Sequence, residues 1–248
     1  MQNAREKVLY GERVAKVLAR AGICSRRQAE NLVHSGRVTV NGQIITTPAT
    51  RITLTDAVYI DGTTAATLPM PTRLWLYYKP RGIVVTHCDP EGRQTVFATL
   101  PTTLPRVISV GRLDLTSEGL LLLTNSGSFA RQLELPANRW IRRYRVRVHG
   151  KVDNLSLKRL SHTMILNGTV YGPVHASLDR VQGSNAWLTV SLREGRNREI
   201  RRLMEACGWS VNRLIRIAYG PFQLGCLTER ALEEVPAKTL WERISPSQ

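Results

Sequence analysis

Residues 61–72 divide this chain of 248 residues into two parts with different sequence patterns. The segment consists mainly of small residues, threonines and prolines, and it has no apolar face with the period of a helix or a strand. Such a composition is typical of a linker between domains. We therefore predict one domain over residues 11–60 and a second over residues 73–240, each with its own core.

The first domain is predicted to contain two short helices and a β-hairpin. Apolar residues between positions 14 and 21 recur on one helix face, and Gly22 stands where that helix would end. Ser25-Arg26-Arg27-Gln28 has the pattern of a capping box, which opens a second helix. Asn41-Gly42 between alternating apolar residues is a strong signal for a hairpin turn.

Basic residues far outnumber acidic ones over the whole chain. Lys and Arg total 35 against 19 Asp and Glu, a formal net charge of +16. Such a surplus repels itself in a compact chain, so it indicates a polyanionic partner. Nucleic acid is favoured over a membrane surface because no basic amphipathic helix with a bulky aromatic face is visible. A basic surface that is merely solvated is the alternative.

The sequence also excludes several classes of protein. No apolar run is long enough to span a membrane, and the first residues lack the apolar core of a signal peptide, so we expect a cytoplasmic protein. The cysteines are far apart, without C-x-x-C spacing, and the histidines are scattered. We expect no metal site and no disulfide framework.

Arg26 and Arg27 fall in the first turn of the second predicted helix, where basic side chains oppose the helix dipole. This placement favours a phosphate site, and two solvated arginines are the alternative. The residues Arg13–Gly22, Ser25-Arg26-Arg27 and Gly36–Gly42 resemble the S4 RNA-binding domain. The resemblance implies that basic side chains of this domain contact RNA, namely Arg13, Lys16, Arg26, Arg27 and Arg37.

The second domain is rich in predicted strands and lacks a regular βαβ alternation. This pattern favours an α+β domain around a largely antiparallel mixed sheet. The predicted strands are Leu74–Tyr78, Ile83–Thr86, Val107–Val110, Leu120–Thr124, Trp140–His149, Trp187–Leu192 and Arg213–Ala218. The predicted helices are Ser128–Glu134, Asp153–Ser161 and Arg198–Cys207.

Three polar stretches of this domain are candidates for chemistry. Between two apolar runs, the turn around Asp114 holds a carboxylate close to the core, where it would need a partner to stay ionised, and Arg112 is the nearest candidate. Asp114 or Glu118 could equally well be a structural residue that caps the loop and has no chemical role.

The second stretch, residues 139–151, is the most basic part of the chain. As a strand it places Tyr144 on one face and an arginine row on the other, consisting of Arg143, Arg145 and Arg147. The arginines would follow a phosphate backbone and the tyrosine would stack on a base, although Tyr144 could equally be an ordinary core residue.

The third stretch, residues 193–204, leads from a strand into an arginine-rich helix with Arg201 at the margin of the core. A solvated or RNA-facing basic helix is the alternative to a catalytic role. Two of its arginines, Arg196 and Arg198, are further candidates for RNA contacts.

The three stretches and the S4-like domain together resemble the RsuA family of bacterial ribosomal-RNA pseudouridine synthases. The resemblance rests on Gly111-Arg112-Leu113-Asp114 with Ser117–Leu122, and on Tyr78-Lys79-Pro80. The segments Asp89–Arg93 and Glu194–Glu199 are most similar to the RluB-like, large-subunit branch.

This resemblance implies isomerisation of one ribosomal uridine to pseudouridine through base flipping, without a cofactor. It assigns Asp114 as the catalytic residue, either as a nucleophile at C1′ or as a base at C2′. The same resemblance makes Arg201 the basic residue facing that carboxylate and Tyr144 the residue stacking on the flipped base. Leu214 would pack in the pocket, and Arg112 would hold the flipped nucleotide.

The expected partner is ribosomal RNA or a ribosomal precursor particle, with the enzyme acting as a single chain. A non-catalytic RNA-binding or ribosome-assembly protein would use the same basic surface without Asp114. A nucleoside-hydrolase-like glycosidase would need a second positioned carboxylate, for which the sequence offers no convincing candidate.

Overall fold

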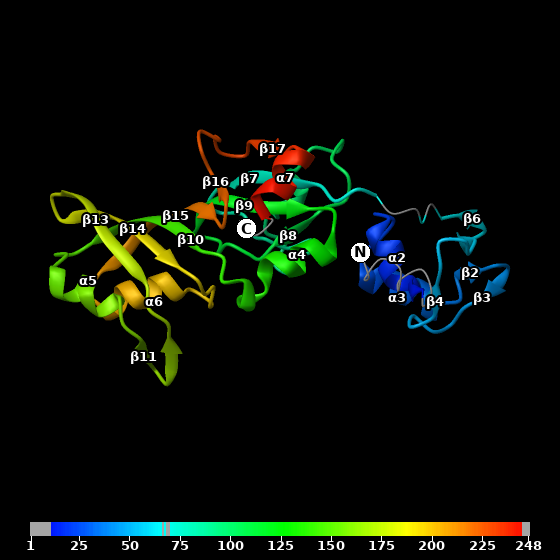
Figure 1. Ribbon diagram of the computed structural model, residues 1–248, viewed down its shortest axis with the longest axis horizontal. Coiled ribbons are helices and arrows are strands. Elements are labelled where there is room, and N and C mark those ends of the chain that lie inside the picture. The colour runs from blue at the N-terminus through cyan, green and yellow to red at the C-terminus, as the bar shows by residue number, and fades with distance from the viewer. Residues whose placement is uncertain (1–10, 66, 68–69, 245–248) are drawn as a thin grey trace. The chain divides into compact units, whose positions relative to one another are not determined.

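The computed structural model describes residues 11–65, 67 and 70–244. It forms two compact units, one mainly before Arg73 and the other mainly after it (Figure 1). None of the helices formed by the described residues has the length and apolarity to cross a bilayer.

The first unit has the helices and the hairpin that the sequence predicts. Ser25 caps α3 with a complete capping box, in which its hydroxyl accepts from the Gln28 amide and its own amide donates to the Gln28 side chain. Asn41 and Gly42 both have positive φ, as the predicted two-residue turn requires. The elements are β1 (Glu12–Arg13), α2 (Val14–Arg20), α3 (Arg26–His34), β2 (Val38–Val40), β3 (Gln43–Ile44), β4 (Arg51–Ile52), β5 (Val58–Ile60) and β6 (Thr63–Thr64).

The core of this unit lies between the two helices and a four-stranded sheet of order β3-β2-β5-β6. Val14, Leu18 and Val33 are fully buried there against Val38 and Val58. The apolar stripe of α2 thus forms the face that the sequence predicts to be internal.

The segment predicted as a linker begins inside this sheet. Asp61 and Gly62 form a second two-residue turn with positive φ, and Thr63–Thr64 return as β6 against β5. Arg37 donates to the carboxylate of Asp61 and fixes the turn. The start of the segment is therefore ordered because turn chemistry, rather than an apolar face, holds it.

The second unit is built on a nine-stranded mixed sheet of order β13-β14-β10-β15-β9-β7-β17, with β16 beside β15 and β8 beside β9. The pair β15–β9 is parallel, and the other pairs of this central path are antiparallel. The predicted α+β class with a largely antiparallel sheet is confirmed. The strands are β7 (Leu74–Lys79), β8 (Ile108–Val110), β9 (Glu118–Thr124), β10 (Arg142–His149), β13 (His175–Gln182), β14 (Asn185–Leu192), β15 (Ser210–Tyr219), β16 (Phe222–Gln223) and β17 (Leu232–Glu234).

Helices and a separate hairpin complete this unit. The helices α5 and α6 lie together on one side of the sheet half that contains β13, β14 and β10 (Figure 1). The remaining elements are α4 (Gly127–Glu134), α5 (Asn154–Leu160), α6 (Glu199–Ala206), α7 (Ala237–Ile244), the short helices η1 (Phe97–Thr99) and η2 (Pro136–Asn138), and the hairpin β11 (Met164–Leu166) and β12 (Thr169–Tyr171).

The second unit differs from the sequence prediction in several features, since the strands β11, β12, β13, β16 and β17 and the helix α7 are not among the predicted elements. Residues Ile83–Thr86 do not form a strand, because their ladder contact is a single bridge between Val84 and Thr95. In addition, α7 continues to Ile244, beyond the predicted end of the domain at residue 240, and buries Leu240.

Candidate active site

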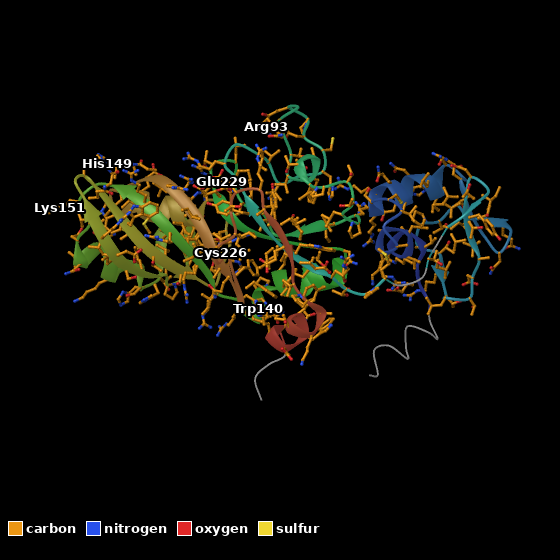
Figure 2. The ribbon with its side chains drawn as sticks, turned by 90° about the horizontal axis from the view of Figure 1, so that it is seen from above. Arg93, Trp140, His149, Lys151, Cys226 and Glu229 are labelled. Carbon is orange, nitrogen blue, oxygen red and sulfur yellow. The ribbon has the colours of Figure 1, made fainter. Side chains whose placement is uncertain are left out.

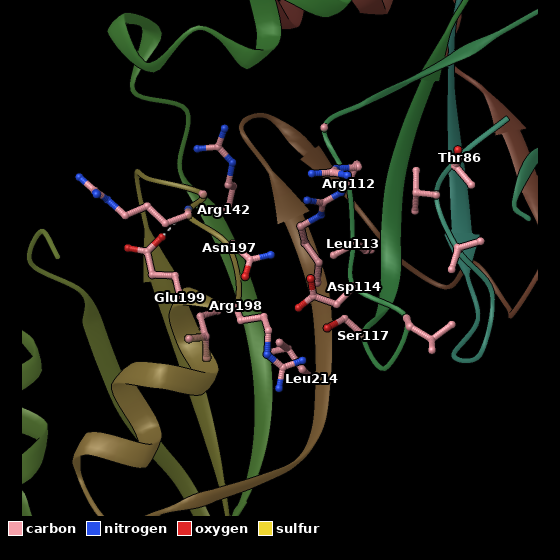
Figure 3. Close-up of a pocket in the computed structure, with 18 of the residues that line it drawn as sticks. Thr86, Arg112, Leu113, Asp114, Ser117, Arg142, Asn197, Arg198, Glu199 and Leu214 are labelled. Carbon is pink, nitrogen blue, oxygen red and sulfur yellow. Dashed lines mark hydrogen bonds between the residues drawn. The ribbon is translucent and has the colours of Figure 1, made fainter. Parts of the chain in front are cut away.

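One pocket of about 620 Å³ lies in the second unit, where loops from both halves of the sheet meet (Figure 3). Its wall brings together residues far apart in the sequence: Asp114 from the turn before β9, Tyr144 from β10, Leu214 from β15 and Glu199 from α6. A volume of this size is ordinary for a site that takes a ligand as large as a nucleotide.

Asp114 is positioned by a tight turn between β8 and β9. The amide of Ser117 donates to the backbone carbonyl of Asp114 at 3.0 Å, and the amide of Gly111 donates to the Glu134 carboxylate at 2.7 Å. Asp114 is half-buried in the pocket wall, although the sequence predicts a carboxylate held close to the core. Its carboxylate therefore has access both to the pocket and to solvent (Figure 3).

Arg112 does not pair with Asp114 as the sequence analysis expected. Within the described residues no hydrogen bond or ion pair joins the two side chains, and Arg112 is exposed at the pocket wall. The physical reason is the half-burial of Asp114, because a carboxylate that water reaches needs no buried counterion.

Tyr144 and Leu214 form an apolar part of the pocket. Tyr144 is 8% exposed and Leu214 is 5% exposed, and both line the cavity. They lie on the paired strands β10 and β15, with Tyr144 opposite Arg216 in the register. The two residues thus give the pocket that Asp114 also lines an apolar surface suited to a flat ring.

Arg201 supports the Asp114 turn from behind the pocket wall. Its Nη2 donates to the carbonyl of Thr116 at 3.2 Å, and its Nη1 donates to the carbonyl of Val211 at 3.1 Å. Burial is the main cause that lowers its pKa, the charge of Arg198 adds to this, and the negative charge of Asp114 acts in the opposite direction. The guanidinium stays charged and within electrostatic reach of Asp114, but it makes no ion pair with it within the described residues.

A buried lysine lies under the same turn. The Nζ of Lys79, at the end of β7, donates to the carbonyls of Pro80 and Ser117 at 2.9 Å each, and the residue is fully buried. Burial lowers the pKa of Lys79 to about 8, although the charges of Asp114 and Glu118 act in the opposite direction. Lys79 therefore binds the turn and supplies positive charge near Asp114 at neutral pH.

Arg216 occupies the floor of the pocket beside Tyr144. It is 2% exposed, its Nε donates to the Leu120 carbonyl at 2.7 Å, and its Nη2 has no partner within the described residues. Such an unsatisfied buried donor is uncommon and marks a site of function or strain. The hydroxyl of Ser117, also on the pocket wall, is buried and unpartnered in the same way.

Exposed basic residues surround the opening. Arg196 and Arg198, which the sequence marks as candidates for RNA contacts, line the pocket from the loop before α6, where Arg198 has a left-handed backbone conformation. Arg196 pairs with Glu194 at 2.6 Å. The backbone amide of Arg196 donates to the carboxylate of Glu199. Burial raises the pKa of Glu199. These cations would face the phosphates of a polynucleotide that enters the pocket.

Arg143, Arg145 and Arg147 do not line the pocket. They alternate along β10 with Tyr144, Val146 and Val148, which are buried, so the three arginines project from the other face of the sheet. The sequence predicts this alternation correctly, and the structure separates the arginine row from the candidate active site.

The predicted basic residues of the first unit have different surroundings. Lys16 pairs with Glu12 at 3.0 Å, Arg26 pairs with Glu30 at 3.1 Å, and Arg37 pairs with Asp61. A shallow hollow of this unit is lined by Arg13, Lys16, Arg26 and Arg51, while Arg27 is exposed on α3. Their contact with RNA stays a prediction.

Three supporting residues were not assigned a role from the sequence: Lys79, Arg216 and Ser117. Two of these residues carry a signal in the sequence. Lys79 is a charged residue at the end of an apolar run, and Arg216 is a basic residue two positions after Leu214, on the same side of a predicted strand. The described part of the chain contains no cluster of three His, Cys, Asp or Glu residues that could hold a metal ion.

Comparison with known proteins identifies the family. The model of the family described as RNA pseudouridylate synthase matches residues 73–206, and the S4 domain model matches residues 12–58. The chain belongs to the RNA pseudouridylate synthase family. This synthase is 50% identical over 229 residues to an uncharacterized RNA pseudouridine synthase of Rickettsia felis, covering 92% of this chain and 99% of the relative.

Two further comparisons agree with this assignment. The synthase is 44% identical over 220 residues to the ribosomal large subunit pseudouridine synthase B of Haemophilus influenzae, covering 86% of this chain and 61% of the relative. A crystal structure of a pseudouridylate synthase matches its fold with a TM-score of 0.65 at 24% identity, over 94% of this chain and 99% of that one. The synthase is therefore an isomerase with an S4 RNA-binding domain, as the sequence predicts.

Proposed function

We propose that this synthase converts one uridine of ribosomal RNA, in the large subunit, to pseudouridine, with Asp114 as the catalytic residue. The observation that carries the proposal is the pocket itself, whose wall brings Asp114 together with Tyr144 and Leu214. The large-subunit assignment is supported by relatives named ribosomal large subunit pseudouridine synthase B, at 43–44% identity. A ribosomal substrate also supports a cytoplasmic site of action.

The reaction breaks the bond between N1 of uracil and C1′ of ribose and forms a bond between C5 and C1′. The base rotates between the two steps, N1 gains a proton and C5 loses one, so substrate and product have the same atoms. Positive charge develops on the ribose when the glycosidic bond breaks, and a carboxylate is suited to stabilise that charge or to attack C1′. Removal of the C2′ proton by the same carboxylate is the other route open to Asp114.

The residues around Asp114 fit these requirements. Lys79 and Arg201 place positive charge near its carboxylate, and neither forms an ion pair with it within the described residues, so both carboxylate oxygens stay available to the substrate. Both residues also donate to the backbone of the Asp114 turn, at Ser117 and Thr116. The carboxylate is thereby held in place while the base moves.

The apolar residues would keep the detached uracil in the pocket. Tyr144 would stack on the ring and Leu214 would contact its edge, which limits loss of the free base to water. Arg112, Arg196 and Arg198 at the exposed wall would bind the phosphates next to the flipped nucleotide, because flipping costs a few kcal/mol that such contacts offset.

The test is a comparison of the wild-type synthase with Asp114→Asn on unmodified large-subunit ribosomal RNA. Pseudouridine is mapped by carbodiimide-blocked primer extension, and RNA binding is measured in parallel. We expect Asp114→Asn to abolish product, with RNA affinity changed by less than about tenfold because phosphate contacts elsewhere dominate binding.

Glu233→Gln, which removes an exposed carboxylate on β17, is the matched control and should retain full activity. Turnover by Asp114→Asn would remove Asp114 from the mechanism. Unmodified small-subunit ribosomal RNA is assayed in parallel, and product on that RNA alone would refute the large-subunit assignment.

A further inference from the structure

The face of the sheet opposite the pocket carries a second concentration of positive charge. The strands β13, β14, β10 and β15 form this half of the sheet, and α5 and α6 lie on its other side (Figure 1). Because side chains alternate along each strand, residues that neighbour Tyr144 in the sequence point away from the pocket. We call this the outer face; it is defined by Arg143, Arg145 and Arg147 on β10, Trp187 and Thr189 on β14, and Asp179 and Arg180 on β13.

The strand register brings these residues into rows across the sheet. Arg147 is opposite Trp187 on one side, and Trp187 is opposite Arg180 on β13. In the next row, Arg145 is opposite Thr189, whose hydroxyl donates to Asp179. Alternate residues of a strand are about 6.7 Å apart, so Arg143 and Arg147 are separated by about 13 Å along β10.

Most of the positive charge on the outer face is not neutralised. The Nε of Arg145 lies 3.8 Å from a carboxylate oxygen of Asp179, the acidic residue among those that define the outer face. Arg143 and Arg180 are exposed and make no ion pair within the described residues. Arg147 is half-buried, and its Nε has no hydrogen-bond partner among those residues. His149 extends the row at the end of β10, near Lys151 (Figure 2).

Trp187 gives this surface a rigid centre. It is 9% exposed, and the guanidinium of Arg145 lies 4.9 Å from its ring centroid. A cation held against an indole ring is restricted in its rotamers, so it loses little entropy when it binds an anion. Arg145 is therefore a fixed cation at the centre of the outer face, with the exposed Arg143 and Arg180 on the same face.

We propose that the outer face binds the phosphate backbone of a structured RNA segment different from the one that carries the target uridine. This inference rests on the proposed function for the kind of RNA, ribosomal RNA. The geometry carries the rest: the sheet itself separates the outer face from the pocket, and the residues of the two sites do not overlap. A short stem-loop with its uridine in the pocket would leave this face free, whereas a large folded RNA offers a second backbone to it.

The experiment uses the full chain with Arg143, Arg147 and Arg180 each changed to Gln, which leaves the Arg145–Trp187 contact in place. The matched control changes three exposed basic residues elsewhere in the second unit to Gln: Arg131, Lys158 and Lys238. Affinity and its salt dependence are measured for two probes, a whole large-subunit ribosomal RNA transcript and a short stem-loop that carries the uridine mapped with the wild type. Thermal unfolding checks that each variant is folded.

For the outer-face variant we expect at least about a tenfold loss of affinity for the whole transcript and a salt slope smaller by about 2, since each phosphate contact contributes about 0.7–0.9. Affinity for the stem-loop and the rate of pseudouridine formation on it should stay within about twofold of the wild type. The control variant should resemble the wild type on both probes.

Three results would overturn the proposal: an unchanged salt slope with the whole transcript, an equal loss on the stem-loop, or the same loss in the control variant. If binding to the transcript is unchanged, binding to a ribosomal precursor particle is measured as well. Weaker binding there would assign the face to a ribosomal protein and would also refute the proposal. A failure of the proposed function is distinguishable, because the wild type would then form no pseudouridine on either probe.

Discussion

Arg213 donates two hydrogen bonds to the buried carboxylate of Glu118, from Nε at 2.7 Å and from Nη2 at 3.1 Å. The pair joins β15 to β9 beside the only parallel pairing in the central path of the described sheet. Tyr78 adds a third donor to the same carboxylate. Burial raises the pKa of Glu118, but the hydrogen bonds and the charge of Arg213 outweigh it, so that this pKa lies below its usual value.

Arg213→Gln should lower the free energy of unfolding by about 2–3 kcal/mol at neutral pH, because it leaves a buried carboxylate without its cation. Below the usual glutamate pKa the loss should shrink, since the variant can protonate Glu118 and the wild type progressively loses the ion pair as pH falls through the lowered pKa. Urea denaturation at neutral pH and at about pH 4 measures both values. The control Glu234→Gln breaks an exposed pair with Arg73 and should cost less than about 1 kcal/mol. Equal losses in the two variants would show that burial of Glu118 does not matter.

Lys79 should make the stability of the synthase rise with pH above about 8. Its pKa is lowered to about 8 in the folded chain from 10.5, so between these values the unfolded chain binds a proton that the folded chain does not. Stability due to this group is therefore gained as pH rises through that window. Unfolding free energies of the wild type and of Lys79→Met, measured across the window, should diverge in favour of the wild type. Other titrating groups cancel in this comparison, and parallel curves would contradict the prediction.

Arg216→Lys should lower the rate of pseudouridine formation by about tenfold or more while RNA affinity stays nearly unchanged. The substitution keeps the charge but removes the fixed donor to Leu120 and the second arm of the guanidinium at the pocket floor. Affinity should not change because a residue 2% exposed cannot serve the phosphate backbone. Single-turnover release of tritium from C5 of labelled uridine measures the chemical step. Arg131→Lys, at an exposed position of α4, is the control, and normal turnover by Arg216→Lys would exclude a role for the floor guanidinium.

Gly119→Ala should destabilise the second unit by about 3 kcal/mol or more. Gly119 has φ +99°, and an added Cβ would lie 2.4 Å from the carbonyl oxygen of Arg216 on the paired strand. Gly168→Ala separates the two causes, since φ is +74° there but no atom lies within 4 Å of the added Cβ. We expect a cost of about 1–2 kcal/mol for that control. Thermal unfolding of both variants measures the two losses of stability. An equal loss in the two would show that the close approach of β9 and β15 adds nothing to the cost of positive φ.

The sequence predicts the parts of this fold that local chemistry determines. The Ser25–Gln28 capping box and the Asn41-Gly42 turn form as expected because their signals lie within a few residues of each other. The alternation along β10 is also correct, because burial of Tyr144, Val146 and Val148 forces the arginines outward.

Features that depend on distant partners are the ones that the sequence analysis misses. The edge strand β13 is exposed along most of its length, so it has no apolar alternation to reveal it. Ile83–Thr86 has the residues of a strand but no neighbouring strand to pair with beyond one bridge. At the site, the resemblance places Asp114, Tyr144 and Leu214 in one pocket correctly. The contacts of Arg201 with Thr116 and Val211 become visible only once α6, β15 and the Asp114 turn are folded together.

The alternation of β10 limits how this protein can change during evolution. Loss or gain of a single codon within Arg142–His149 would rotate every following side chain to the opposite surface of the strand, so guanidinium groups would enter the interior and the buried aromatic ring would face water. Insertions in the connecting loops carry no such penalty. We therefore expect natural length variation among relatives to avoid this strand, or to occur in it only in steps of two residues.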